Sequence, residues 1–274
     1  MIAPHRHRSI LVRIQAGGVA RVSELARELD VTEETIRRDL KALADRGEVE
    51  RVHGGAVAPP AEPERELPFA QRHAAHAAAK RAIAAAAASA VEPGQAIALD
   101  PSTTACQLAL LLPDAPLTVV TNSLVVCSLL AEKPAIEVIC TGGTLDPEAM
   151  AFFGLATAEA LEKLRVDRLF FSCRGVDLGF GDGAGRGLSE TNDRHAALKL
   201  AMLRSAQAAT LLVDTSKLGH ASTVLYAPVD AADRVIVERS ADPERAAAVA
   251  RLRSSGVEVE EAQASAPPRG VAAA

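Results

Sequence analysis

The chain has 274 residues, which is long for one ordinary domain and comfortable for two. Its 35 acidic residues outnumber its 30 basic ones, and the excess lies after residue 57, so the larger part of the chain is not a nucleic-acid surface by charge. The absence of any CxxC pair and of an apolar run of ~20 residues argues against a disulfide framework, a zinc site and a membrane span.

Spacing and capping residues predict three helices near the N-terminus. Apolar residues recur at helical spacing over about residues 7–15. Ser23 is a predicted N-cap for a short second helix over about residues 24–29. Thr32 is a predicted N-cap for a third helix that ends near Asp45.

The third helix has the features of a DNA recognition helix. Ile36, Leu40 and Leu43 form an apolar stripe that must face inward. Arginine on the outward surface can bind guanine bidentately, a contact worth about 1–3 kcal/mol of discrimination. The residues expected to meet base edges and phosphates are Thr32, Thr35, Arg37, Arg38 and Lys41.

A two-stranded wing is predicted after this helix. Residues 49–52 alternate as a strand, and His53-Gly54-Gly55 forms a turn into the partner strand Ala56–Val57. His53 and Gly54, at the turn, join the candidate DNA contacts.

Charge alone does not predict DNA binding, because residues 1–57 carry ten basic and nine acidic side chains. A basic amphipathic helix is usually a solvated face, and a winged helix can also serve as a protein-interaction module. The combination of a short helix, a tight turn, the sequence TIRRDL and a GG turn after a strand favours DNA binding.

The rest of the chain alternates strands and helices. Proline and charge concentrate after residue 58, as in a semi-rigid linker. Short apolar strands between helices predict an α/β fold with a mostly parallel sheet covered on both faces. The predicted regions are a winged helix-turn-helix domain at residues 3–58, a linker at 59–72, a larger α/β domain at 73–261 and a disordered tail at 262–274.

The predicted strands lie at residues 96–99, 117–121, 136–140, 168–173 and 209–214, and the predicted helices at 76–91, 105–112, 122–131, 156–164 and 191–206. A glycine-rich loop is expected over residues 175–187. The four cysteines, Cys106, Cys127, Cys140 and Cys173, stand singly in apolar segments and are expected to be buried thiols in a reducing cytoplasm. The histidines show no spacing typical of a metal site, and no cofactor is expected.

Polar residues follow the carboxyl ends of five predicted strands, where open α/β sheets bind ligands. Hydroxyls and N–H groups after Asp100 suit a phosphate, since a helix N-terminus favours an anion. Asn122, Asp177 and Asp214 can bind hydroxyls, and Lys217 can supply a charge. Each cluster alone would read as an ordinary cap or turn. Together they predict a site for a small phosphorylated sugar or polyol.

With TEETIRRDLKALADRGEVERVHGGAV near the start and LDPSTT, TVVTNS, TGGTL and DTSK along the body, the chain resembles the DeoR family of bacterial transcription regulators over about residues 6–240. The resemblance implies a winged helix-turn-helix and a sensor domain related in fold to ribose-5-phosphate isomerase. It also implies a homo-oligomeric repressor of sugar or polyol catabolic genes that a phosphorylated intermediate releases from double-stranded operator DNA.

The resemblance also implies roles for residues of this sequence. Asp100, Ser102, Thr103 and Thr104 would form the phosphate loop, and Lys80 would reach the phosphate. The rest of the effector pocket would come from Thr121, Asn122, Gly142, Gly143, Asp177, Asp214 and Lys217.

Two positions depart from the family pattern. Pro101-Ser102 stands where a glycine is usual, which makes the loop stiffer and removes one N–H donor. Arg174 adds a cation, which would either favour a more anionic effector or pair with a nearby acid.

Two other functions remain open from the sequence. One is a sugar-phosphate isomerase-like enzyme that uses Asp177 as general base. The other is a regulator that has lost its effector response and acts constitutively.

Overall fold

The computed structural model describes residues 6–7, 9–11, 13–14, 19–45, 49–52, 54–57, 67–179 and 187–263. The chain forms two compact units, Met1–Pro63 and Glu64–Ala274. The candidate DNA contact His53, the linker residues 59–66 and the tail from residue 264 lie outside the described residues.

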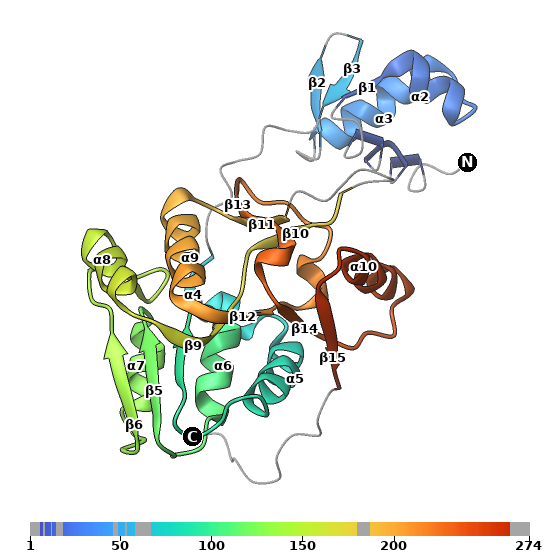
Figure 1. Cartoon of the computed structure of the whole chain (residues 1–274). Coiled ribbons are helices and arrows are strands. Elements are labelled where there is room, and N and C mark those ends of the chain that lie inside the picture. Colours follow the sequence, from blue (N-terminus) through green and yellow to red (C-terminus); the bar gives the residue numbers. More distant parts are fainter. Residues whose placement is uncertain are drawn as a thin grey trace. The chain divides into compact units, whose positions relative to one another are not determined.

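The first unit is the expected winged helix-turn-helix (Figure 1). The described residues between 6 and 14 are helical, and α2 (Val22–Glu28) and α3 (Glu33–Asp45) follow. β1 (Val19–Arg21), β2 (Glu50–Val52) and β3 (Gly55–Val57) form an antiparallel sheet in the order β1-β3-β2. The helices share one apolar core that includes Ile10, Ile14, Leu25, Ile36, Leu40 and Leu43.

The strand β1 was not predicted, because its pairing is with a distant part of the chain. Arg21 pairs with Gly55 in an antiparallel register. A Cβ atom at Gly55 would lie 2.3 Å from the carbonyl oxygen of Ala20, so glycine is what lets these two strands approach. The wing therefore has a third strand.

The predicted cap of α3 is confirmed and that of α2 is wrong. Thr32 Oγ1 accepts a hydrogen bond from the N–H of Thr35 at 3.3 Å. In contrast, α2 begins before Ser23, which lies exposed in its first turn. The N–H of Val22 donates to the carbonyl of Gly54 at 2.9 Å, so the wing turn satisfies the start of α2 without a side-chain cap.

The second unit contains a seven-stranded parallel sheet in the order β15-β14-β12-β9-β4-β5-β6 (Figure 1). The expected α/β class is confirmed, and three of the strands end where they were predicted. The strands are β4 (Ala96–Leu99), β5 (Leu117–Thr121), β6 (Ile136–Cys140), β9 (Val166–Phe171), β12 (Ala206–Leu212), β14 (Arg234–Glu238) and β15 (Glu258–Ala262).

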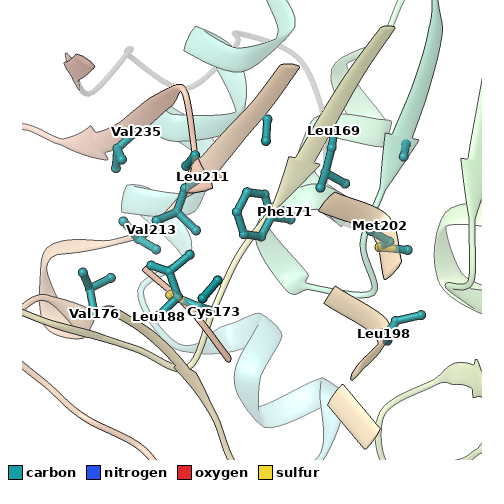
Figure 2. Close-up of a cluster of buried hydrophobic side chains, with 14 of the residues drawn as sticks. Leu169, Phe171, Cys173, Val176, Leu188, Leu198, Met202, Leu211, Val213 and Val235 are labelled. Atoms are coloured by element: carbon teal, nitrogen blue, oxygen red, sulfur yellow. The ribbon is translucent and has the colours of Figure 1, made fainter. Parts of the chain in front are cut away.

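Helices cover both faces of this sheet. They are α4 (Phe69–Ala74), α5 (Ala77–Ala88), α6 (Thr103–Leu111), α7 (Leu124–Leu130), α8 (Leu155–Lys163), α9 (Asp193–Ser205) and α10 (Pro243–Ser254). Successive residues of a strand point to opposite faces. Phe170 thus packs in one apolar cluster with residues of α5 to α7, and Phe171 in another with residues of α8 to α10. Figure 2 shows Phe171 between Leu169, Leu211 and Met202 in the second cluster.

Among the described residues of the second unit, five short strands outside the large sheet were not predicted. β7 (Thr144–Asp146) and β8 (Ala151–Phe153) form a hairpin. β10 (Gly175–Asp177), β11 (Gly187–Glu190) and β13 (Val224–Ala227) form a small antiparallel sheet. The expected glycine-rich loop is therefore a strand at both ends, and residues 180–186 between them lie outside the described part. Residues 69–72, expected in the linker, belong to α4 instead.

The cysteines differ in exposure. Cys106 and Cys173 are buried, as expected, and Cys127 is half-buried. Cys140 is exposed, so the expectation of a buried thiol is wrong there, because it ends β6 at the edge of the sheet. Within the ranges that the structure describes, no helix combines the length and apolar character needed to cross a membrane.

Candidate functional site

The outward surface of α3 carries the predicted DNA contacts. The side chains of Arg37 and Arg38 are 52% and 81% exposed. Thr32 and Lys41 are also exposed, and Thr35 is half-buried with its hydroxyl 2.9 Å from that of Thr32. All five residues are therefore available on one helix, away from its buried stripe.

Both arginines are held by acidic residues of the first turn of α3. Arg37 Nη2 lies 2.6 Å from Glu33 Oε2, and Arg38 Nε lies 3.5 Å from Glu34 Oε1. Exposed pairs of this spacing contribute about 0.3–0.5 kcal/mol, whereas a bidentate contact with guanine is worth about 1–3 kcal/mol. A bidentate contact with guanine is therefore strong enough to replace the ion pair of each arginine with its glutamate.

The wing turn presents Gly54, which is exposed and has a φ of +81°. This left-handed conformation favours glycine and places the backbone, without a side chain, at the tip between β2 and β3. A close approach to a phosphate backbone is sterically open there, since nothing lies within 4 Å of a Cβ built at this residue.

The second unit contains a cavity of about 350 Å³ at the carboxyl ends of β4, β9 and β12. Five of the predicted effector residues line it together: Lys80, Ser102, Thr103, Asp214 and Lys217. Pro101 and Arg174, where the chain departs from the family pattern, also line it. The cavity thus lies at the carboxyl ends of parallel strands, the edge at which open α/β sheets bind ligands.

The lining also contains polar residues that the sequence analysis missed. Some precede the large sheet, His195 and Lys199 lie on α9, and the others lie at strand ends or in loops. They are Arg72, His76, Ser172, Glu190, Thr191, His195, Lys199 and His220.

The N-terminus of α6 forms one corner of the cavity. Ser102 caps this helix by accepting the N–H of Ala105 at 3.1 Å. Helix geometry leaves the N–H groups of the first turn without intrahelical acceptors, and the helix dipole makes this end positive. Pro101 lines the same corner without an N–H of its own. The corner favours an anion.

Lys80 is a cation of the cavity whose surroundings oppose its charge. It is buried, and its ammonium group donates to the carbonyl of Ala75 at 2.7 Å and to that of Arg72. Burial and the nearby charge of Lys217 lower the pKa of Lys80 to about 8, although Asp214 acts in the opposite direction. An anion beside Lys80 would stabilise its charged form.

Asp214 and Lys217 lie in the turn after β12. Burial opposes the charge of Asp214, but Lys217 and a hydrogen bond from Ser216 hold its pKa below the ordinary value. The Lys217 ammonium donates to Ser172 Oγ at 2.8 Å. Asp214 therefore stays ionised, and the charges of both Lys217 and Lys80 favour its ionised form.

A buried ionic cluster forms part of the cavity wall, because Lys199 and Glu190 line the cavity while their partner Asp100 lies behind them. Lys199 Nζ is 2.5 Å from Asp100 Oδ2 and 3.2 Å from Glu190 Oε1. Burial opposes the charge of Lys199, yet the two carboxylates outweigh it and its pKa lies above the ordinary value. Asp100 also accepts the N–H groups of Ser102 and Ser172 at 3.1 and 2.9 Å. Asp100 therefore supports the lining from behind and does not itself line the cavity.

His195 supplies a neutral wall. Its ring lies against that of Phe153, with the ring centres 4.6 Å apart. Burial, and then the nearby cations Lys199, Arg72 and Arg194, lower the pKa of His195 to about 3. An uncharged imidazole at the cavity suits hydroxyl groups better than a second phosphate.

Six predicted effector residues do not line this cavity: Thr104, Thr121, Asn122, Gly142, Gly143 and Asp177. Thr104 is buried in α6, and Thr121 Oγ1 donates to the carbonyl of Leu99 at 2.7 Å. Asp177 Oδ1 accepts the N–H of Gly179 at 2.9 Å. The expectation that all five strand-end clusters meet at one pocket is wrong.

The β7–β8 hairpin explains why β5 and β6 do not contribute. Asn122 Nδ2 donates to the carbonyl of Phe152 at 2.8 Å, and the N–H of Phe152 donates to the carbonyl of Asn122 at the same distance. Thr157 Oγ1 donates to the carbonyl of Gly142 at 2.6 Å. Gly143 packs so closely that a Cβ atom would meet Thr157 at 2.3 Å. These residues hold the hairpin and α8.

Family models match most of the chain. Residues 6–61 match the DeoR-like helix-turn-helix domain, and residues 75–239 match the DeoR C terminal sensor domain. The uncharacterized HTH-type transcriptional regulator YulB of Bacillus subtilis is 37% identical over 94% of this chain and 96% of its own length. The L-fucose operon activator of Haemophilus influenzae is 35% identical over 86% of this chain and 92% of its own.

A putative aga operon transcriptional repressor of Escherichia coli O157:H7 is 29% identical over 93% of this chain and 92% of its own. Among solved structures, the sorbitol operon regulator SorC of Klebsiella pneumoniae matches 85% of this chain and 94% of its own, with 14% identity and a TM-score of 0.38. Ribose 5-phosphate isomerase A of Methanocaldococcus jannaschii matches 50% of this chain and 52% of its own, with 19% identity and a TM-score of 0.33.

Proposed function

The chain belongs to the DeoR family of transcriptional regulators, and we propose that it represses genes of sugar or polyol catabolism until a phosphorylated sugar or polyol binds its cavity. The observation that carries this proposal is the convergence of Lys80, Lys217 and the α6 N-terminus on one cavity. Two lysines and a helix N-terminus suit a phosphate dianion. Of the relatives named above, one is an L-fucose operon activator and another a putative aga operon transcriptional repressor.

The proposed contacts of the effector divide by chemistry. The phosphate lies among Lys80, Lys217, Ser102 and Thr103. The hydroxyls lie toward the neutral His195 and the other polar residues of the wall. Lys199, in the lining, and Asp100, behind it, hold the site in place, and no effector contact is proposed for the six residues that lie outside the lining.

The cavity also touches the start of the second unit. Leu67, Arg72, Ala75 and His76 line it, and Lys80 donates to two carbonyls of this segment. A ligand that draws Lys80 toward a phosphate competes with those two bonds. The segment follows the linker in the chain, so such a change gives effector binding a differential effect on DNA-competent and DNA-incompetent states, which is what regulation requires.

We further propose that the protein acts as a homo-oligomer in the cytoplasm. A two-fold symmetric pair presents two copies of α3 to two half-sites of an operator. On the DNA, Arg37, Arg38 and Lys41 would contact bases and phosphates together with the two threonines of the helix and Gly54 and His53 of the wing.

The isomerase alternative receives no support from the site. Its general base, Asp177, does not line the cavity and accepts a backbone hydrogen bond from Gly179. Binding of a phosphorylated compound would argue against the constitutive alternative, in which the regulator has lost its effector response.

Calorimetric titration with sugar and polyol phosphates, each beside its unphosphorylated counterpart, tests the sensor. We expect a phosphorylated compound to bind and its counterpart not to. The affinity should fall about fivefold to tenfold between about pH 7 and about pH 9, because Lys80, with its pKa of about 8, loses its proton there while the phosphate stays a dianion. Binding should therefore take up about half a proton per site at pH 8.

Lys80→Met is expected to weaken binding at both pH values and to remove most of the pH dependence. Lys163→Met, at an exposed position in α8, is the matched control and should behave as the wild type. If no phosphorylated compound binds, the proposal that the second unit senses a phosphorylated effector is wrong. That result would support a regulator that acts constitutively. If binding does not change with pH, Lys80 is not a phosphate contact.

A further inference from the structure

The recognition helix carries a buried carboxylate on its apolar face. Asp39 lies between Ile36, Leu40 and Leu43, the residues that α3 packs into the core. Its side chain is only 7% exposed, although that of the adjacent Arg38 is 81% exposed. A carboxylate in such a place is costly unless it is paired, so its partners have a role in the unit.

The partners of Asp39 come from the N-terminal helical segment. Arg6 Nε donates to Asp39 Oδ2 at 2.8 Å, and Arg6 Nη2 donates to Asp39 Oδ1 at 3.1 Å. His7 Nε2 lies 3.0 Å from Asp39 Oδ1. Burial opposes the charge of Asp39, but the bonds from Arg6 and His7 outweigh it and lower the pKa of the carboxyl. The carboxylate is thus ionised and held by two residues.

The contact between Asp39 and Arg6 depends on the orientation of both groups, whereas the contacts of the apolar core do not. Residues 6, 10 and 14 follow at helical spacing, so the segment meets α3 through a polar contact and then through Ile10 and Ile14. Apolar contacts tolerate sliding and rotation, whereas a bidentate pair between a guanidinium and a carboxylate fixes both groups in one plane. The pair therefore determines how α3 is turned about its own axis.

The rotation of α3 about its own axis determines where its outward side chains point. With 3.6 residues per turn, neighbouring side chains are about 100° apart around the axis. Fixing Asp39 inward therefore fixes Arg38, Arg37 and Thr35 at set angles on the outer surface. A small rotation of α3 would move the arginine forks away from the base edges while leaving their positive charge in place.

We infer that Asp39, held by Arg6 and His7, is a positioning residue that orients the recognition helix for sequence-specific DNA binding and does not itself contact DNA. This inference rests on α3 being the recognition helix, as proposed above. It assigns to Arg6 a role in specificity that does not depend on its charge alone, since lysine would keep the charge and lose the fork.

The test compares two DNA probes at one fixed salt concentration. The specific probe is the duplex that the wild-type protein enriches from a random-sequence pool, and the nonspecific probe is poly(dI-dC). Arg6→Lys is expected to lower affinity for the specific duplex about tenfold and to leave affinity for poly(dI-dC) unchanged, because charge controls nonspecific binding. Asp39→Asn, which keeps the shape and one acceptor, should produce a smaller loss in the same direction.

Two further variants make the outcome decisive. Arg13→Lys alters the exposed pair with Glu28, which joins the same N-terminal segment to α2, and should bind both probes as the wild type does. Arg37→Ala reports on α3 itself. If Arg37→Ala binds the specific duplex normally, α3 is not the recognition helix and the proposed interface fails.

The inference alone is overturned if Arg37→Ala loses specific binding while Arg6→Lys and Asp39→Asn keep it. It is also overturned if both variants lose specific and nonspecific binding equally, because a merely structural contact would act on both probes. Circular dichroism at the assay temperature establishes that each variant is folded.

Discussion

A variant with alanine at both Arg37 and Arg38 is expected to bind the selected duplex at least about 30-fold more weakly than the wild type. Each bidentate arginine–guanine contact contributes about 1–3 kcal/mol, and 1.4 kcal/mol corresponds to a factor of ten in affinity. The glutamates that hold these arginines in the free protein are exposed, so their pairs are too weak to compensate. Fluorescence anisotropy with competitor DNA at fixed salt measures the effect.

The matched control removes the same charge from the second unit. Arg165 and Arg204 are exposed there, and the double variant Arg165→Ala/Arg204→Ala should bind the duplex like the wild type. Equal affinities for the wild type and the Arg37→Ala/Arg38→Ala variant would show that DNA is bound by another surface.

The largest loss of stability is expected from Lys199→Met. This substitution leaves Asp100 and Glu190 buried beside each other without their shared cation. Removing one partner of a buried ionic cluster costs about 3–5 kcal/mol, because the remaining charge is left uncompensated. Chemical denaturation of the full chain, followed by circular dichroism, should show this decrease in the unfolding of the second unit.

Two comparisons separate the cluster from the loss of a lysine in general. Lys163→Met, at an exposed position, should unfold as the wild type does. Adding Asp100→Asn and Glu190→Gln to Lys199→Met removes the unpaired charges and should restore part of the stability. If Lys199→Met is as stable as Lys163→Met, the ionic cluster does not contribute to the stability of the second unit.

Local chemistry made much of this fold predictable. Thr32 reads as a helix cap because its hydroxyl satisfies a nearby N–H, and the structure shows that bond. The strands β4 to β6 were located from short apolar runs bounded by turn residues. Ser102 and Thr103 follow a strand directly, so their place at the ligand end of the sheet could be predicted from chain order.

Contacts between distant parts of the chain could not be predicted in this way. Lys199 meets Asp100 across 99 positions, and Arg6 meets Asp39 across 33, so no local pattern indicates either pair. Ser23 failed as a cap because a carbonyl of the wing already serves the start of α2. The error at Asn122 and Gly142 has the same origin, since the β7–β8 hairpin and α8 occupy a position that looked open to a ligand.

If binding at the cavity controls binding at α3, a phosphorylated compound should release the DNA from the protein. The complex of the wild-type protein with its selected duplex is titrated, at fixed near-physiological salt, with sugar and polyol phosphates and with their unphosphorylated counterparts, and anisotropy reports release of the DNA. We expect one phosphorylated compound to release the duplex and its counterpart to have no effect. Lys217→Met should bind the duplex as the wild type does and lose the response. Control of DNA binding by the cavity would be contradicted if no phosphorylated compound altered the specific complex. It would also be contradicted if the compound released the duplex from Lys217→Met as readily as from the wild type.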